Sequence, residues 1–185
     1  MINWNICLKC RSIQRTCCDN YPNIPLTIKD IRRISALGFS PDEFIIAGEY
    51  DADVLKHDEC WWRNNAIKLN NRFFKVNTRK KKGRTCMFLD KNSGCILKEN
   101  RPALCKIYPF WVDSHNKVIY EAVNKRCLIV QSNQSISEGL AQMGETEKTI
   151  KKYFEEVKKD CLENRKEHKK LVIDAVKKGR VKLSD

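Results

Sequence analysis

Residues 86–109 read CMFLDKNSGCILKENRPALCKIYP and hold three of the ten cysteines in this chain of 185 residues. Within this stretch, the turn-forming residues 92–94 come directly before Cys95. Pro102 suits the first position of a short helix, and Pro109 would end that helix. The stretch therefore predicts a part of the fold that is organised by its cysteines.

Seven further cysteines extend this pattern toward both ends of the chain. The ten cysteines lie at positions 7, 10, 17, 18, 60, 86, 95, 105, 127 and 161. Two residues separate Cys7 from Cys10, a spacing that zinc sites, iron–sulfur sites and thiol–disulfide motifs all use. No strand is predicted before Cys7, which disfavours the thiol–disulfide motif. Adjacent side chains usually point apart, so we expect one of Cys17 and Cys18 to be a ligand and the other to pack or to serve a second centre.

The sequence contains no apolar run long enough to span a membrane, and its first residues lack the charged and apolar regions of a signal peptide. We therefore predict a cytoplasmic protein with no membrane partner. Because a reducing cytosol keeps thiols reduced, clustered cysteines there indicate metal binding or redox chemistry. The alternative is a chain held together by disulfides, which some hyperthermophiles tolerate inside the cell.

The net charge of +13 is distributed unevenly. Residues 1–60 carry 7 Lys or Arg and 9 Asp or Glu, whereas residues 61–185 carry 29 and 14. This asymmetry favours an anionic partner, either RNA or an acidic protein face, and a lysine-rich surface that serves only solubility is the alternative. The candidate nucleic-acid-binding residues are Lys80, Lys81, Lys82 and Arg84, which lie near several aromatic residues in the sequence.

Local patterns in the first 130 residues predict short helices and hairpins. Residues 1–20 are expected to form a cysteine-rich loop. Thr27 as N-cap and Asp30 three positions later predict a helix that ends before Gly38. A second helix is predicted to begin at Ser40-Pro41 and to end near Gly48. Strands are predicted at 72–76 and 85–89, and a hairpin is predicted from 110–112 and 118–120.

The C-terminal part of the chain has a helical period. Apolar residues at 150, 153, 154 and 157 form one stripe within a helical region from 137 to about 168. Residues 171–176 either extend this helical region or form a last helix, and the helix is expected to stop at Gly179. The predicted fold is therefore α+β, with a small cysteine-organised metal-binding domain over residues 1–130 and a helical extension over 131–185 packed on it.

The cysteine pattern resembles the CxxCxxCC cysteine-cluster family, also called YkgJ-type, a family of zinc- or iron-chelating domains. The matching residues are Cys7, Cys10, Cys17, Cys18, Pro25-Leu26-Thr27, Asp30-Ile31, Gly38-Phe39-Ser40-Pro41, Phe44, Cys86, Phe88-Leu89, Cys95-Ile96, Arg101-Pro102, Cys105 and Tyr108-Pro109. Six residues separate Cys10 from Cys17, where the family usually has two. The pattern is also distantly similar to that of flagellin lysine-N-methylases, which implies protein modification as one activity.

The resemblance implies a chelated metal or an iron–sulfur centre. The resemblance favours an iron–sulfur cluster of the [4Fe–4S] type, and zinc is the alternative, because four thiolates satisfy either centre and ligand type does not decide between them. The predicted metal ligands are Cys7, Cys10, Cys17, Cys18, Cys86, Cys95, Cys105 and Cys127. Arg101 and Tyr108 are predicted to lie beside the centre and to interact with its sulfur or its charge. Cys60 is expected to be a buried thiol, Cys161 a thiol that binds no metal, and the three histidines surface residues.

Two functions remain open from the sequence. The first is an iron–sulfur protein with a redox or macromolecule-modifying role. The second is a structural zinc-binding module with a basic face that binds nucleic acid. No Ser/His/Asp set or pair of carboxylates stands out, so no catalytic residue is assigned and the sequence leaves enzymatic activity undecided.

Overall fold

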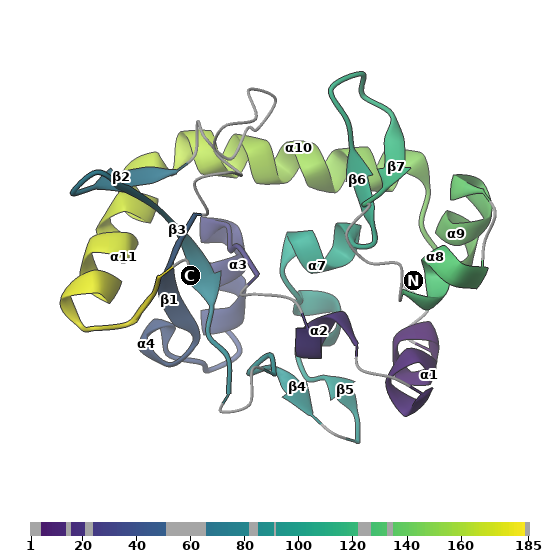
Figure 1. The fold of residues 1–185 in the computed structure, drawn as a ribbon, viewed down its shortest axis with the longest axis horizontal. Coiled ribbons are helices and arrows are strands. Elements are labelled where there is room, and N and C mark those ends of the chain that lie inside the picture. The colour runs from purple at the N-terminus through teal and green to yellow at the C-terminus, as the bar shows by residue number, and fades with distance from the viewer. Residues whose placement is uncertain are drawn as a thin grey trace.

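The computed structural model describes residues 5–13, 16–20, 24–50, 66–81, 85–90, 92–121, 127–132 and 135–183. Helices and small sheets are mixed along the chain, which confirms the predicted α+β class (Figure 1). The elements are α1 (Asn5–Ile13), α2 (Cys17–Asn20), α3 (Ile28–Ser35), α4 (Pro41–Phe44), β1 (Ile45–Glu49), β2 (Ile67–Leu69), β3 (Arg72–Thr78), β4 (Leu89–Asp90), β5 (Gly94–Cys95), η1 (Lys98–Asn100), α7 (Ala103–Ile107), β6 (Phe110–Val112), β7 (Val118–Tyr120), α8 (Leu128–Ser132), α9 (Ile136–Met143), α10 (Glu147–Glu163), α11 (Arg165–Lys177) and β8 (Val181–Lys182).

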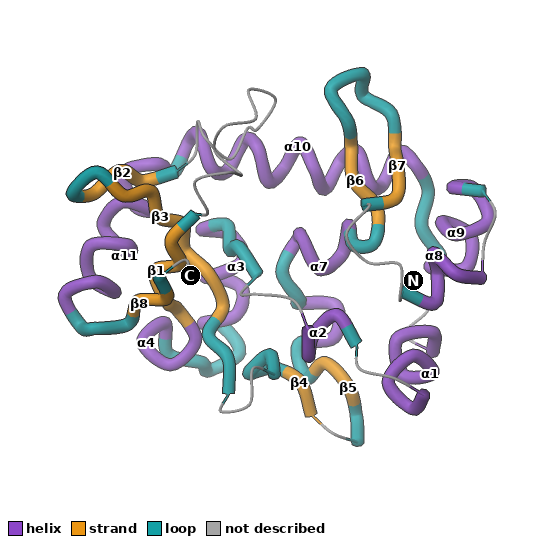
Figure 2. Tube along the Cα trace, in the orientation of Figure 1, coloured by secondary structure: helices purple, strands orange, loops and turns teal. Residues whose placement is uncertain are grey.

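The largest sheet combines strands from both ends of the chain, in the order β2-β3-β1-β8 (Figure 2). β1 and β3 are antiparallel, with Ile45 opposite Thr78, and β8 runs parallel to β1. The predicted strand at 72–76 is confirmed within β3. The predicted helix that ended near Gly48 is wrong beyond Phe44, because the chain turns there into β1. The β-branched residues after Phe44 favour a strand once β3 is present as a partner.

Two separate hairpins complete the β structure. β6 and β7 pair from Phe110 opposite Tyr120 to Val112 opposite Val118, which confirms the predicted hairpin. β4 and β5 form the second hairpin, in which Leu89 lies opposite Cys95. The strand predicted at 85–89 is shorter than expected, since only its last residue belongs to β4.

Helices α1 and α2 correct the prediction of a loop over residues 1–20. The loop prediction weighed the cysteines and overlooked that Asn5–Ile13 contains neither proline nor glycine. In the C-terminal part, the predicted helical region is confirmed as three helices, α9, α10 and α11, with Gly144 in the left-handed conformation between the first two. Within the described residues, no helix is long and apolar enough to cross a membrane.

Helix α3 begins at a cap built from two parts of the chain. The Thr27 hydroxyl accepts a hydrogen bond from the backbone N–H of Asp30, which confirms the predicted N-cap. The carboxylate of Asp160, on α10, accepts hydrogen bonds from the backbone N–H groups of Ile28 at 2.7 Å and Lys29 at 3.3 Å. The first N–H groups of α3 are thereby satisfied in a buried environment, where unpaired groups are costly.

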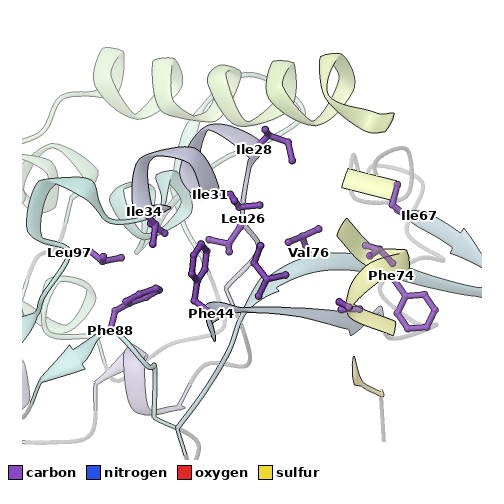
Figure 3. Close-up of a cluster of buried hydrophobic side chains, with 14 residues drawn as sticks. Leu26, Ile28, Ile31, Ile34, Phe44, Ile67, Phe74, Val76, Phe88 and Leu97 are labelled. Atoms are coloured by element: carbon purple, nitrogen blue, oxygen red, sulfur yellow. The ribbon is translucent and has the colours of Figure 1, made fainter. Parts of the chain in front are cut away.

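Two clusters of buried apolar side chains form the core. The first, drawn in Figure 3, includes Phe44, Phe88 and Leu97 and is completed by Val172 of α11. The second includes Phe110 and extends through α10 to Val157. Both clusters contain residues from either side of position 130. The division into domains at that position stays a prediction.

His168 is a correction to the predicted surface histidines. It is only 7% exposed, and its Nε2 atom lies 3.6 Å from the Oδ2 atom of Asp160. The two residues are eight positions apart and lie on different helices, on either side of Asn164. No sequence pattern predicts such a contact. His115 is exposed as predicted, and His57 lies outside the described residues.

Candidate metal centre

One cavity of about 710 Å³ collects most of the cysteines of the chain. Its lining includes seven of them: Cys10, Cys17, Cys18, Cys86, Cys95, Cys105 and Cys127. They come from α1, α2, β5 and α7 and from the segments that precede β4 and α8. The fold thus brings segments that are far apart in the sequence to one concave site. The side chain of Cys7 and the whole of Cys60 lie outside the described residues.

Four of these thiols are electrostatic neighbours. Burial raises the pKa of Cys86 to about 12, and the nearby Cys18 raises it further. Burial is also the main cause of the raised pKa of Cys95, with Cys18 contributing. The pKa of Cys105 is raised well above its usual value by burial and then by Cys18, Cys86 and Cys95. Each thiol would be easier to deprotonate if a cation replaced the lost solvation.

Cys10 and Cys127 form a second group at the same cavity. α1, which carries Cys10, contacts α8, which Cys127 directly precedes. Burial raises the pKa of Cys127, and Cys10 is the thiol that raises it further. Six of the predicted ligands therefore fall into two groups. One group consists of Cys18 and the three thiols whose pKa values it raises, Cys86, Cys95 and Cys105. The other consists of Cys127 and Cys10, which raises the pKa of Cys127.

Cationic side chains lie beside the thiols. Arg101 is 6% exposed, lines the cavity, and lowers the pKa values of Cys95 and Cys105 against the effect of burial. Lys80 forms a β-bridge with Cys86 and lowers its pKa in the same way. Tyr108 also lines the cavity. The positive charges of Arg101 and Lys80 would offset part of the negative charge of a thiolate centre.

The segment that carries Arg101 is held by α3. The buried carboxylate of Asp30 accepts a hydrogen bond from the backbone N–H of Ala103, at the start of α7, and pairs with Arg33. Arg33 in turn donates to the carbonyl oxygens of Asn100 at 3.2 Å and Arg101 at 3.0 Å. These bonds fix the first turn of α7, the helix that presents Cys105 to the cavity.

The donor chemistry of the site fits a thiophilic metal. Among the described residues, no three or more His, Cys, Asp or Glu side chains converge closely enough to hold one ion. A single zinc ion needs its sulfur ligands about 2.3 Å from one point. The ligands of a [4Fe–4S] cluster bind different iron atoms, so they surround the centre without meeting at one point. The thiols that line the cavity supply the sulfur donors that either centre requires.

Comparison with known proteins places this site in a family. The family model CxxCxxCC, whose description is "Putative zinc- or iron-chelating domain", matches residues 6–128, about two thirds of the chain. The chain belongs to the CxxCxxCC family. The match contains every cysteine that lines the cavity and ends before α9, so α9, α10 and α11 lie outside it. No curated protein and no solved structure matches the chain.

The other sequence-predicted residues have varied positions. Cys161 packs against the second core cluster, where burial raises its pKa to about 12, and it does not line the cavity. Lys80 faces the cavity, and the Nζ atom of Lys81 donates to the carbonyl oxygen of Leu89 at 3.0 Å. Lys82 and Arg84 lie outside the described residues. The assignment of this basic run to nucleic-acid binding stays a prediction.

Sequence reasoning missed the residues that position the site. Asp30 was predicted as part of a helix cap and of the family pattern, and neither predicts its contact with Ala103, which lies 73 positions away. Asp160 stands in the charged run Lys158-Lys159-Asp160, which has the composition of a solvated helix face. Asp160 is completely buried because it accepts hydrogen bonds from two backbone N–H groups of α3. No local sequence pattern predicts these bonds.

Proposed function

We propose that the chain is a metal-binding protein whose cavity holds an iron–sulfur cluster of the [4Fe–4S] type through Cys18, Cys86, Cys95 and Cys105. The observation that carries the proposal is that these four cysteines line one cavity, where Cys18 raises the pKa values of the other three. The family description supports the coarser statement, chelation of zinc or iron. When bound, such a cluster supplies one-electron transfer.

The protein side chains would each have a defined part in holding the cluster. The four thiols bind as thiolates and release protons on binding, because burial keeps them protonated without a metal. Arg101 and Lys80 lower the thiol pKa values and offset the negative charge. The apolar residues around the cavity, including Phe88 and Ile107, limit access of water.

Metal and sulfide analysis of the anaerobically purified chain, with a visible absorption spectrum, tests the proposal. A [4Fe–4S] cluster predicts about four iron and four sulfide per chain and a brown protein. About one zinc per chain in a colourless protein would favour the alternative of a structural zinc module. A protein that holds neither metal would contradict both readings.

A further inference from the structure

Helix α11 carries an exposed row of lysines that the metal centre does not use. Lys166, Lys169, Lys170 and Lys177 are all exposed. Their spacing of i, i+3, i+4 and i+11 places them on one side of the helix. The opposite side is buried in the first core cluster through Val172 and Ala175, each 0% exposed. We call these four lysines the α11 lysine row.

The α11 lysine row differs from the lysines of the neighbouring helix in its pairing. On α10, the ion pairs within the helix are Lys151 with Glu147, Lys152 with Glu156, Lys158 with Glu155 and Lys159 with Glu163. Within the described part of the chain, no lysine of the row forms an ion pair or a side-chain hydrogen bond. Among the described residues, no carboxylate therefore pairs with the positive charges of the row.

Unpaired lysines in such a row repel one another, and a bound anion would reduce this repulsion. Lys166 and Lys170 stand at i, i+4, where like charges weaken a helix. The row extends over twelve residues, and its first and last members are about 16 Å apart along the helix axis. Phosphates follow one another at about 3.4 Å of axial rise along one strand of a duplex, so the row can face about four or five of them.

The chemistry of the row selects among anionic partners. Insertion into a membrane surface requires an exposed apolar helix face, and the apolar face of α11 is occupied by the core. Protein interfaces are depleted in lysine and depend on aromatic or arginine anchors, which the row lacks. Lysines that act as flexible point charges are typical of contacts to a phosphate backbone.

We propose that the α11 lysine row binds the phosphate backbone of a nucleic acid without sequence preference. This surface lies outside residues 6–128 and does not depend on the metal centre. It is also distinct from the basic run at 80–84, where Lys80 faces the cavity and Lys81 is bonded to a carbonyl oxygen. Helix α11 carries five Lys or Arg and two Asp or Glu, so it contributes +3 to the net charge of +13, and the core holds it through Val172 and Ala175.

The test compares two variants of the full chain with equal net charge. One replaces the row, as K166A/K169A/K170A/K177A, and the other replaces the paired lysines of α10, as K151A/K152A/K158A/K159A. Binding of a labelled 20-nucleotide RNA of mixed sequence, and of a DNA duplex of equal length, is followed by fluorescence anisotropy between 50 and 300 mM salt. Circular dichroism and metal content establish that both variants fold and load as the wild type does.

The row variant is expected to bind at least about tenfold more weakly near 100 mM salt, and its slope of log affinity against log salt should be shallower by about 3. The α10 variant should keep most of the wild-type slope. Equal losses in both variants, or no binding of RNA or DNA by the wild type, would overturn the proposal. So would tighter binding to polyglutamate or to phosphatidylserine vesicles than to either nucleic acid, because an acidic protein or a membrane would then be the partner.

Discussion

At the scale of single residues, burial sets the chemistry of the thiols. Cys86 and Cys105 are held in surroundings that strongly favour the protonated form; Lys80 acts in the opposite direction on Cys86, and Arg101 does so on Cys105. Raised thiol pKa values mean that protons compete effectively with a metal for the sulfur atoms. Metal retention should therefore depend on pH and on the cation beside the thiols.

Replacing Arg101 by glutamine should make the centre more sensitive to acid. Loss of the guanidinium raises the pKa values of Cys95 and Cys105 further, so protons displace the metal at a higher pH than in the wild type. Metal retained after incubation across a pH series measures the midpoint of release. Arg32→Gln, at an exposed residue paired with Glu167, is the control and should leave the midpoint unchanged.

At the scale of elements, hydrogen bonds connect α10 to α3 and α3 to α7. Asp160 caps α3, and Asp30 of α3 holds the start of α7, which carries Cys105. Helix α10 lies outside the family match, and α3 and α7 lie inside it. The extension therefore supports the order of the centre through backbone contacts.

Asp160→Asn should reduce the free energy of unfolding at pH 7 by about 1–3 kcal/mol, because it weakens hydrogen bonds to a buried helix terminus. Urea denaturation of the variant and the wild type measures this. Burial alone would raise the pKa of Asp160, but the His168 side chain and the Ile28 N–H outweigh it and lower that pKa. The ionised carboxylate therefore stabilises the fold above the unfolded pKa of about 3.9 and loses this effect as the pH falls through the lowered folded value.

The difference between the variant and the wild type should accordingly shrink below about pH 4. Glu155→Gln, at an exposed helix pair, serves as the control and should change the stability by less than about 0.5 kcal/mol. An Asp160→Asn effect as small as that of this control would show that the cap of α3 does not need the charge.

The elements that sequence predicted are those whose signals are local. The capping box at Thr27 and the hairpin at 110–120 are complete within a few residues, and both are confirmed. β1 was missed because its identity depends on pairing with β3, and β8 is only two residues long and pairs with β1 from the far end of the chain. The cysteines of the cavity were predicted, but their grouping was not, since spacing does not reveal which thiols become neighbours.

At the scale of the whole molecule, the C-terminal helices belong to the same core as the cysteine-bearing part. Val172 of α11 is fully buried with Phe44, Phe88 and Leu97, and the last two of these also line the cavity. Packing in α11 is thereby connected to the walls of the site. A single folding transition is the expected behaviour of such a shared core.

Two valines of α11 offer a matched test of this shared core. Val172→Ala removes two buried methyl groups and should reduce the free energy of unfolding by about 1–3 kcal/mol. Val176→Ala, at a residue that is 37% exposed, should change it by less than about 0.5 kcal/mol. Chemical denaturation followed by circular dichroism measures both, and equal effects would mean that α11 is not held in the core as the structure describes.

The grouping of four thiols is tested most directly by the adjacent cysteines of α2. Cys18→Ser and Cys17→Ser differ by one position in the chain, and Cys18 is the residue that raises the pKa values of Cys86, Cys95 and Cys105. Iron, sulfide and zinc per chain are measured after anaerobic purification of both variants and the wild type. We predict that Cys18→Ser loses most of the bound metal and that Cys17→Ser retains it. Full retention by Cys18→Ser, or equal loss in both variants, would contradict the four-thiol centre.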